Sequence, residues 1–257
     1  MQILKKTYNK SQLSMLSKSM IIGGGFFILT GILSIILCEL ITDFLPNLKT
    51  NYVFLNIVIG SIIVTYIMSL VWKSIGWNNK NKIWTITITI IYSALLSIAL
   101  GYLFALIKQE FTNGYYLIYL SFVITGAIAF IAGLISINLN KKGAITFGKF
   151  LAMLIFIMMG VSLITLFLLW ISLFYTNLLV TVNSLIFILI IGSAFLSFCY
   201  LIADILLIMK FQQLKSLTAD ENIKNNLVWY FGFRLLTELI NIFLYVIYFL
   251  LKHSRKS

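Results

Sequence analysis

Three ionisable side chains lie inside long apolar stretches in the second half of the sequence, where each is costly unless it is paired or hydrated. Asp204 lies about five residues from one end of its stretch, and Arg234 and Glu238 lie in the next stretch. Because Arg234 and Glu238 are four residues apart, they share a face of a helix. Such a group can form a cluster of ion pairs that only fixes how the helices pack, or it can line a path for ions or protons. Both interpretations remain open at this point.

The depth of these residues predicts which of them pair. At 1.5 Å per residue, Asp204 and Arg234 lie about 8 Å and about 10 Å from the same end of their stretches, if the two stretches form antiparallel neighbours. We therefore expect Arg234 to form a salt bridge with Asp204, Glu238 or both, since its planar guanidinium can donate hydrogen bonds to two carboxylates at once. A positive charge between the two acids would favour the ionised form of each.

The composition places this group in a bilayer. Hydrophobic residues make up 61% of the 257 residues and charged residues only 10%, whereas a water-soluble domain has about 25% charged residues. The net charge of +12 does not indicate a nucleic-acid partner, because the basic residues form short clusters between apolar runs. The partners that this pattern predicts are membrane lipids. The sequence contains no nucleophile–base pair, phosphate loop or metal-ligand cluster, so we expect neither an enzyme nor a cofactor, and no metal site can be assigned.

Seven apolar runs are long enough to cross the hydrocarbon core of a membrane, which takes roughly 20 residues of helix. They fill most of the chain, so the sequence predicts an all-α membrane protein with a single integral membrane domain over residues 1–257. The runs cover approximately residues 20–41, 52–72, 83–107, 116–137, 147–174, 183–209 and 227–251. Because the last run carries two ionisable residues, and lipid-facing charge is avoided, we expect it to be the central helix.

The lysines predict the orientation. Four of them precede the first run, and three mark each of the second, fourth and sixth connections, counting Lys149 just inside the fifth run, while the odd-numbered connections carry one or none. By the positive-inside rule the N-terminus and the even-numbered connections are cytoplasmic, and the protein lies in the cell membrane. Seven crossings would then place Lys252, Arg255 and Lys256 outside, against that rule. The seventh segment either crosses despite them or is re-entrant.

Three stretches resemble the Bax inhibitor family, the transmembrane Bax inhibitor motif proteins, in a divergent bacterial form. Residues 140–151, N-K-K-G-A-I-T-F-G-K-F-L, are similar to the bacterial pattern T-K-[KR]-D-[FL]-[ST]-x-x-G-x-[FL]-L. Residues 211–215, F-Q-Q-L-K, resemble Y-D-T-Q-x-I-K, and residues 235–243, L-L-T-E-L-I-N-I-F, resemble L-Y-L-D-F-I-N-L-F in the last span.

The resemblance implies six helices around a central C-terminal seventh and a pH-responsive leak for calcium or another cation. In the family, two aspartates on the last two spans are taken to gate the leak by sharing protons. Glu238 stands at the last-span aspartate, whereas the other family-aspartate position falls on Lys210 if the glutamine motif is aligned, with Asp204 six residues upstream. Calcium would be a transported ion here. The alternative that the resemblance implies is a non-conducting regulator that binds a membrane protease or quality-control complex.

Overall fold

The computed structural model describes residues 10–44, 52–76, 81–139, 141–172, 179–215 and 221–254. This part of the chain forms seven α-helices and no strand. The helices are α1 (Lys10–Phe44), α2 (Tyr52–Ile75), α3 (Lys82–Glu110), α4 (Gly114–Asn138), α5 (Lys141–Ser172), α6 (Leu179–Lys215) and α7 (Glu221–Ser254). All seven are long and apolar enough to span a membrane, with mean hydropathies of their candidate spans from 1.8 to 2.7. A helix satisfies its own backbone hydrogen bonds, which hydrocarbon cannot do, so apolar runs of this length fold in this way.

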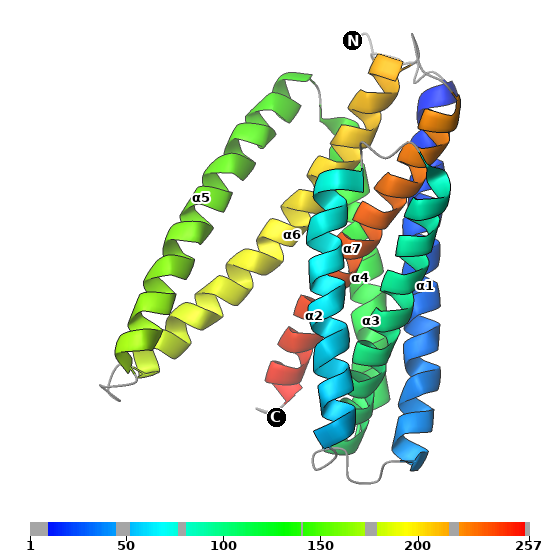
Figure 1. The fold of residues 1–257 in the computed structure, drawn as a ribbon. Helices are drawn as coiled ribbons and strands as arrows, with labels where there is room; N and C mark the ends of the chain where they lie inside the picture. The colour runs from blue at the N-terminus through cyan, green and yellow to red at the C-terminus, as the bar shows by residue number, and fades with distance from the viewer. Residues whose placement is uncertain are drawn as a thin grey trace.

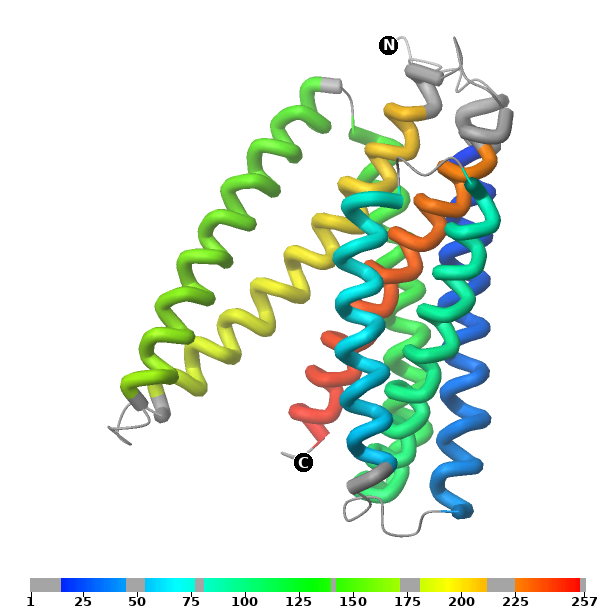
Figure 2. The backbone as a smooth tube through the Cα atoms, viewed as in Figure 1, coloured from blue at the N-terminus to red at the C-terminus, as the bar shows by residue number. Residues whose placement is uncertain are grey.

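The chain runs up and down through the bundle, and the start of α1 and the end of α7 lie at opposite ends of it (Figures 1 and 2). The last segment is one unbroken helix of 34 residues. A re-entrant segment would have to turn back within the membrane, so the structure supports the alternative in which the seventh segment crosses. The sequence-based expectation of seven spans is confirmed. Residues 173 and 174, at the end of the expected fifth span, lie outside the described residues.

Helix α7 occupies the middle of the bundle. It packs against α1, α3, α4 and α6, and its side chains reach α2 through an ion pair and a hydrogen bond described below. The expectation of a central C-terminal helix is therefore confirmed. Of the seven candidate spans, that of α7 has the lowest mean hydropathy, 1.8, yet half of its 18-residue apolar stretch is buried inside the protein. In a bilayer the most polar helix is the one that gains most from being surrounded by protein.

The expected ring of six helices around α7 is wrong for α5. This helix packs against α6 and stands away from the rest of the bundle (Figure 1). Its span has the highest mean hydropathy of the seven, 2.7, and the smallest buried share, 11%. A helix that is apolar on all sides has no face that must avoid lipid, so nothing in its sequence requires a place in the ring.

Close contacts on one side of α7 hold it in place. A Cβ atom at Gly23 of α1 would lie 2.8 Å from the carbonyl oxygen of Gly232, so the two helices cross at a pair of glycines. Further along α7, Phe243 packs against Phe27, Phe104 and Phe122, with ring centroids 4.5–6.1 Å away. These contacts belong to α1, α3 and α4, and they leave the opposite face of α7 turned toward α2 and α6.

Candidate functional site

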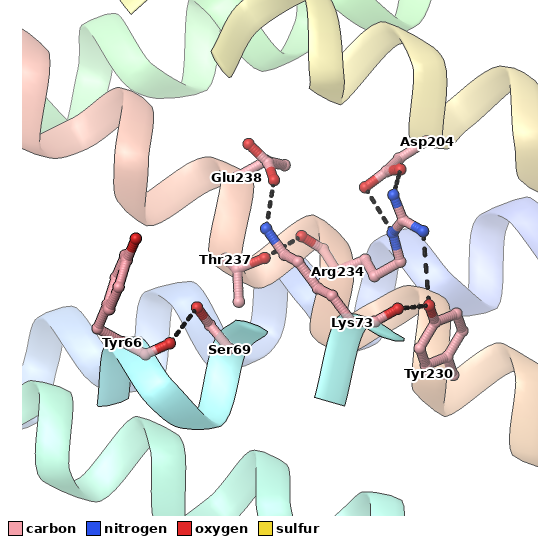
Figure 3. Close-up of polar contacts among 8 residues, drawn as sticks. All are labelled: Tyr66, Ser69, Lys73, Asp204, Tyr230, Arg234, Thr237 and Glu238. Atoms are coloured by element: carbon pink, nitrogen blue, oxygen red, sulfur yellow. Dashed lines mark hydrogen bonds and ion pairs between the residues drawn. The ribbon is translucent and has the colours of Figure 1, made fainter. Parts of the chain in front are cut away.

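Arg234 of α7 and Asp204 of α6 form a two-pronged salt bridge. The guanidinium places Nη2 2.5 Å from Oδ1 of Asp204, and its Nε donates to Oδ2 at 3.1 Å (Figure 3). The side chain of Asp204 is only 2% exposed and that of Arg234 is 23% exposed. This planar, paired geometry is the strongest form of arginine–carboxylate contact. The expected bridge between spans six and seven is confirmed, and it shows that these two residues lie at one level of the bundle.

Glu238 does not join that bridge. Its Oε1 lies 2.6 Å from Nζ of Lys73, near the end of α2, and the glutamate side chain is 5% exposed. Of the expected alternatives, Arg234 therefore pairs with Asp204 alone, and the expectation that it also serves Glu238 is wrong, because α2 supplies a cation of its own. In the sequence Lys73 is one of the three lysines of the second connection, which predict only that this connection is cytoplasmic. Nothing in its neighbourhood, which is the end of an apolar run, indicates that its side chain reaches into the bundle.

Tyr230 connects the two ion pairs. Its hydroxyl donates to the backbone carbonyl of Lys73 at 2.7 Å and accepts a long hydrogen bond of 3.5 Å from Nη1 of Arg234. One turn of α7 separates Tyr230 from Arg234, and another separates Arg234 from Glu238. The three side chains therefore form a row on one face of α7, and this row is linked to α2 at two places and to α6 at one (Figure 3).

The charges of the site balance. Two cations, Lys73 and Arg234, face two carboxylates, Asp204 and Glu238, in separate pairs. Both carboxylates are buried, and an unpaired charge there would be strongly unfavourable. One acceptor is left over: Oε2 of Glu238 is buried and has no hydrogen-bond partner in the part of the chain that the structure describes. The arrangement can hold α2, α6 and α7 together, and it can also close a polar route between them.

Lys210, the other position considered for the family aspartate, lies outside this site. Its side chain is exposed on α6, six residues beyond Asp204. The structure thus brings Asp204, Arg234 and Glu238 together, with Lys73 and Tyr230 as the residues that the sequence did not single out. The first residue of the stretch at 140–151, and the side chains of residues 212–215, lie outside the described residues.

No metal centre is apparent among the described residues, because no three His, Cys, Asp or Glu side chains come together there. Calcium in proteins takes six to eight oxygen ligands, and the carboxylates of this site are each engaged by a nitrogen cation. The site as it stands is therefore closed to a divalent cation.

Comparisons with known proteins give no match: no family model, no characterised protein and no solved structure is significantly similar to this chain.

Proposed function

We propose that this membrane protein is a pH-responsive leak for calcium or another cation, of the Bax inhibitor type, and that the structure is its closed state. The observation that carries the proposal is the pair of salt bridges one turn apart on the same face of α7, Asp204–Arg234 and Glu238–Lys73, which join three helices. Buried charge in a membrane protein is expensive, and it commonly marks an ion route.

The pH response follows from the chemistry of the pairs. A carboxylate that takes up a proton no longer holds its cation, so proton uptake at Asp204 or Glu238 loosens the link from α7 to α6 or to α2. The titratable groups near the two carboxylates are Lys73 of α2, Tyr92 of α3, Tyr200 of α6, and Tyr230 and Arg234 of α7. Under this proposal the N-terminus is cytoplasmic, and the site lies in the cytoplasmic half of the bundle, as the lysine distribution predicts.

The test is calcium flux into liposomes that contain a calcium dye, measured from pH 6 to pH 8 with the purified protein. Replacing Arg234 with Gln removes a tethered cation from the route, so flux should rise and become more dependent on pH. The variant should also be less stable, because Asp204 is left buried and unpaired; breaking such a pair costs up to about 3–5 kcal/mol. The partial exposure of Arg234, 23%, places the expected cost at the lower end of that range.

Lys210→Gln is the matched control, since it removes one positive charge from an exposed position of α6. Its flux should equal that of the parent protein. If Arg234→Gln is as stable as the parent and its flux is unchanged at every pH, Arg234 is not part of a conduction site. An effect of Lys210→Gln that equals the effect of Arg234→Gln would point to general surface charge instead.

A second role is favoured by the position of α5. Because this helix stands apart and only 11% of its span is buried within the chain, its surface is open to another membrane protein. Under this alternative the protein is a non-conducting regulator that binds a membrane protease or quality-control complex, and the ion pairs serve packing only. It would then give no flux in liposomes and would co-purify with a protease.

A further inference from the structure

The polar face of α7 continues past the ion pairs to the other end of the helix. At 100° per residue, seven side chains fall within about 80° of one another around the helix axis. We call this row the polar stripe; it comprises Tyr230, Arg234, Glu238, Asn241, Tyr245, Tyr248 and Lys252. The opposite face carries the buried apolar residues Leu236, Leu239, Phe243 and Ile247.

The contacts of the polar stripe show which way it faces. Arg234 and Lys252 touch α6, the first through Asp204 and the second over the ring of Phe187, 3.3 Å from its centroid. Tyr230 and Glu238 touch α2, both through Lys73. Asn241 and Tyr245 lie between these contacts along the helix, so they face the space between α2 and α6. Both side chains are only partly buried.

Asn241 lies at the depth where water is least expected. It is close to the middle of the candidate span Asn225–Ser254, about 15 Å from either membrane face. Its side chain is half-buried, and its amide makes no side-chain hydrogen bond with the described residues. An amide without partners costs several kcal/mol in hydrocarbon. The unpartnered Oε2 of Glu238 lies one turn away on the same face.

Tyrosines near a membrane face commonly anchor a helix in the headgroup zone, which is a sufficient account of Tyr248 alone. It does not account for Asn241, nor for a row that joins the charged site to the end of the helix without an apolar interruption. Water along this face would satisfy the amide of Asn241 and the hydroxyls of Tyr245 and Tyr248 together.

We infer that the part of the polar stripe from Glu238 to Lys252 lines a water-filled crevice between α2 and α6. Through this crevice, hydrated cations reach the ion pairs from the C-terminal end of the bundle. Asn241 and Tyr245 are the residues that contact the ion or its water there. The inference deepens the proposed function and rests on it for the role of the crevice, whereas the presence of water can be measured without any flux.

The experiment uses single cysteines in the full-length protein in liposomes, with the two native cysteines, Cys38 and Cys199, replaced by alanine. Both are buried in the structure. A membrane-impermeant thiosulfonate is added from the side of the C-terminus, and labelling rates are compared. Asn241→Cys and Tyr245→Cys should react at least about tenfold faster than the controls, because the thiolate that attacks the reagent forms only where water is present.

Two controls distinguish a side chain that contacts water from one that is merely exposed on the protein surface. Val246→Cys is half-buried like Tyr245 and adjacent to it, but lies off the stripe. Phe156→Cys lies at the middle of α5, and the phenylalanine there is 80% exposed, so it reports an open surface that faces lipid.

The inference is overturned if Asn241→Cys and Tyr245→Cys react as slowly as Phe156→Cys. It is also overturned if they form disulfides between two copies of the chain, because the face would then be covered by a second protein and not by water. Labelling without calcium flux in any variant would support the crevice and refute the leak. Flux that rises in Arg234→Gln, together with no labelling, would support the leak and refute this route.

Discussion

Replacing Gly23 with alanine should destabilise the protein, because α1 crosses α7 at this residue, beside the turn that carries Arg234. The new Cβ would lie 2.8 Å from the carbonyl oxygen of Gly232 and 2.9 Å from Cβ of Leu235. Both atoms are fixed to the backbone of α7, so the contact is relieved only if the two helices separate by several tenths of an ångström. Overpacking of this kind costs typically about 1–3 kcal/mol.

Gly24→Ala is the matched control, since a Cβ at Gly24 would meet nothing within 4 Å. Both substitutions remove a glycine from the same helix, where alanine is favoured by about 0.5–1 kcal/mol. This gain cancels when the two variants are compared. Gly23→Ala should therefore be less stable than Gly24→Ala by about 1–3 kcal/mol.

The assay is unfolding in mixed micelles with increasing dodecyl sulfate, followed by circular dichroism. If the two variants differ by less than about 0.5 kcal/mol, the range of substitutions that touch nothing, the two helices do not cross as closely as the structure has them. The same variants can be taken into the flux assay. A shift of α7 at Gly232 should then also disturb Arg234, which is two residues further along the helix.

Two further predictions concern the second ion pair and the orientation. Lys73→Gln and Glu238→Gln should each lower the free energy of unfolding. The double variant should lose less than the sum of the two single losses, with a coupling energy of about 0.5–3 kcal/mol. If the two losses are strictly additive, the pair does not form. Cysteines placed at Asn79 and Asn113 should label from the cytoplasmic and the external side respectively, because only the second connection is rich in lysine. Labelling of the first from outside, or protection of the second, would reverse the topology.

The spans and the central helix could be predicted from the sequence, because a bilayer selects segments by their apolar length and excludes charged residues from its lipid-facing surface. Apolar length determines which segments cross, and all seven candidate spans exceed the required hydropathy. Arg234 and Glu238 in a membrane segment exclude it from the lipid surface. The depth of Asp204 and Arg234, counted in residues from the ends of their runs, was also sufficient to predict their contact.

The partner of Glu238 and the place of α5 could not be predicted in this way. Lys73 lies near the end of its helix, where a lysine normally extends toward water, and sequence spacing does not show that the ammonium group turns inward. The α5 sequence is apolar on every side, so it specifies no face for packing. The polar stripe, in contrast, is readable in the sequence once residues 230–252 are placed at 100° intervals, since its members recur every three or four residues.

The balance of charge limits how acid can act on the site. If Asp204 or Glu238 takes up a proton, one ion pair is lost and the site carries a net positive charge, which repels a divalent cation at short range. Proton uptake alone therefore does not admit calcium. The route opens only if the released Arg234 or Lys73 also moves away, and both retain the freedom to do so, since their side chains are 23% and 26% exposed. Under the proposed function, the response of the parent protein to pH thus depends on the movement of two tethered cations. In Arg234→Gln one of these cations is absent, so the proton on Asp204 acts directly on the route and the dependence of flux on pH increases.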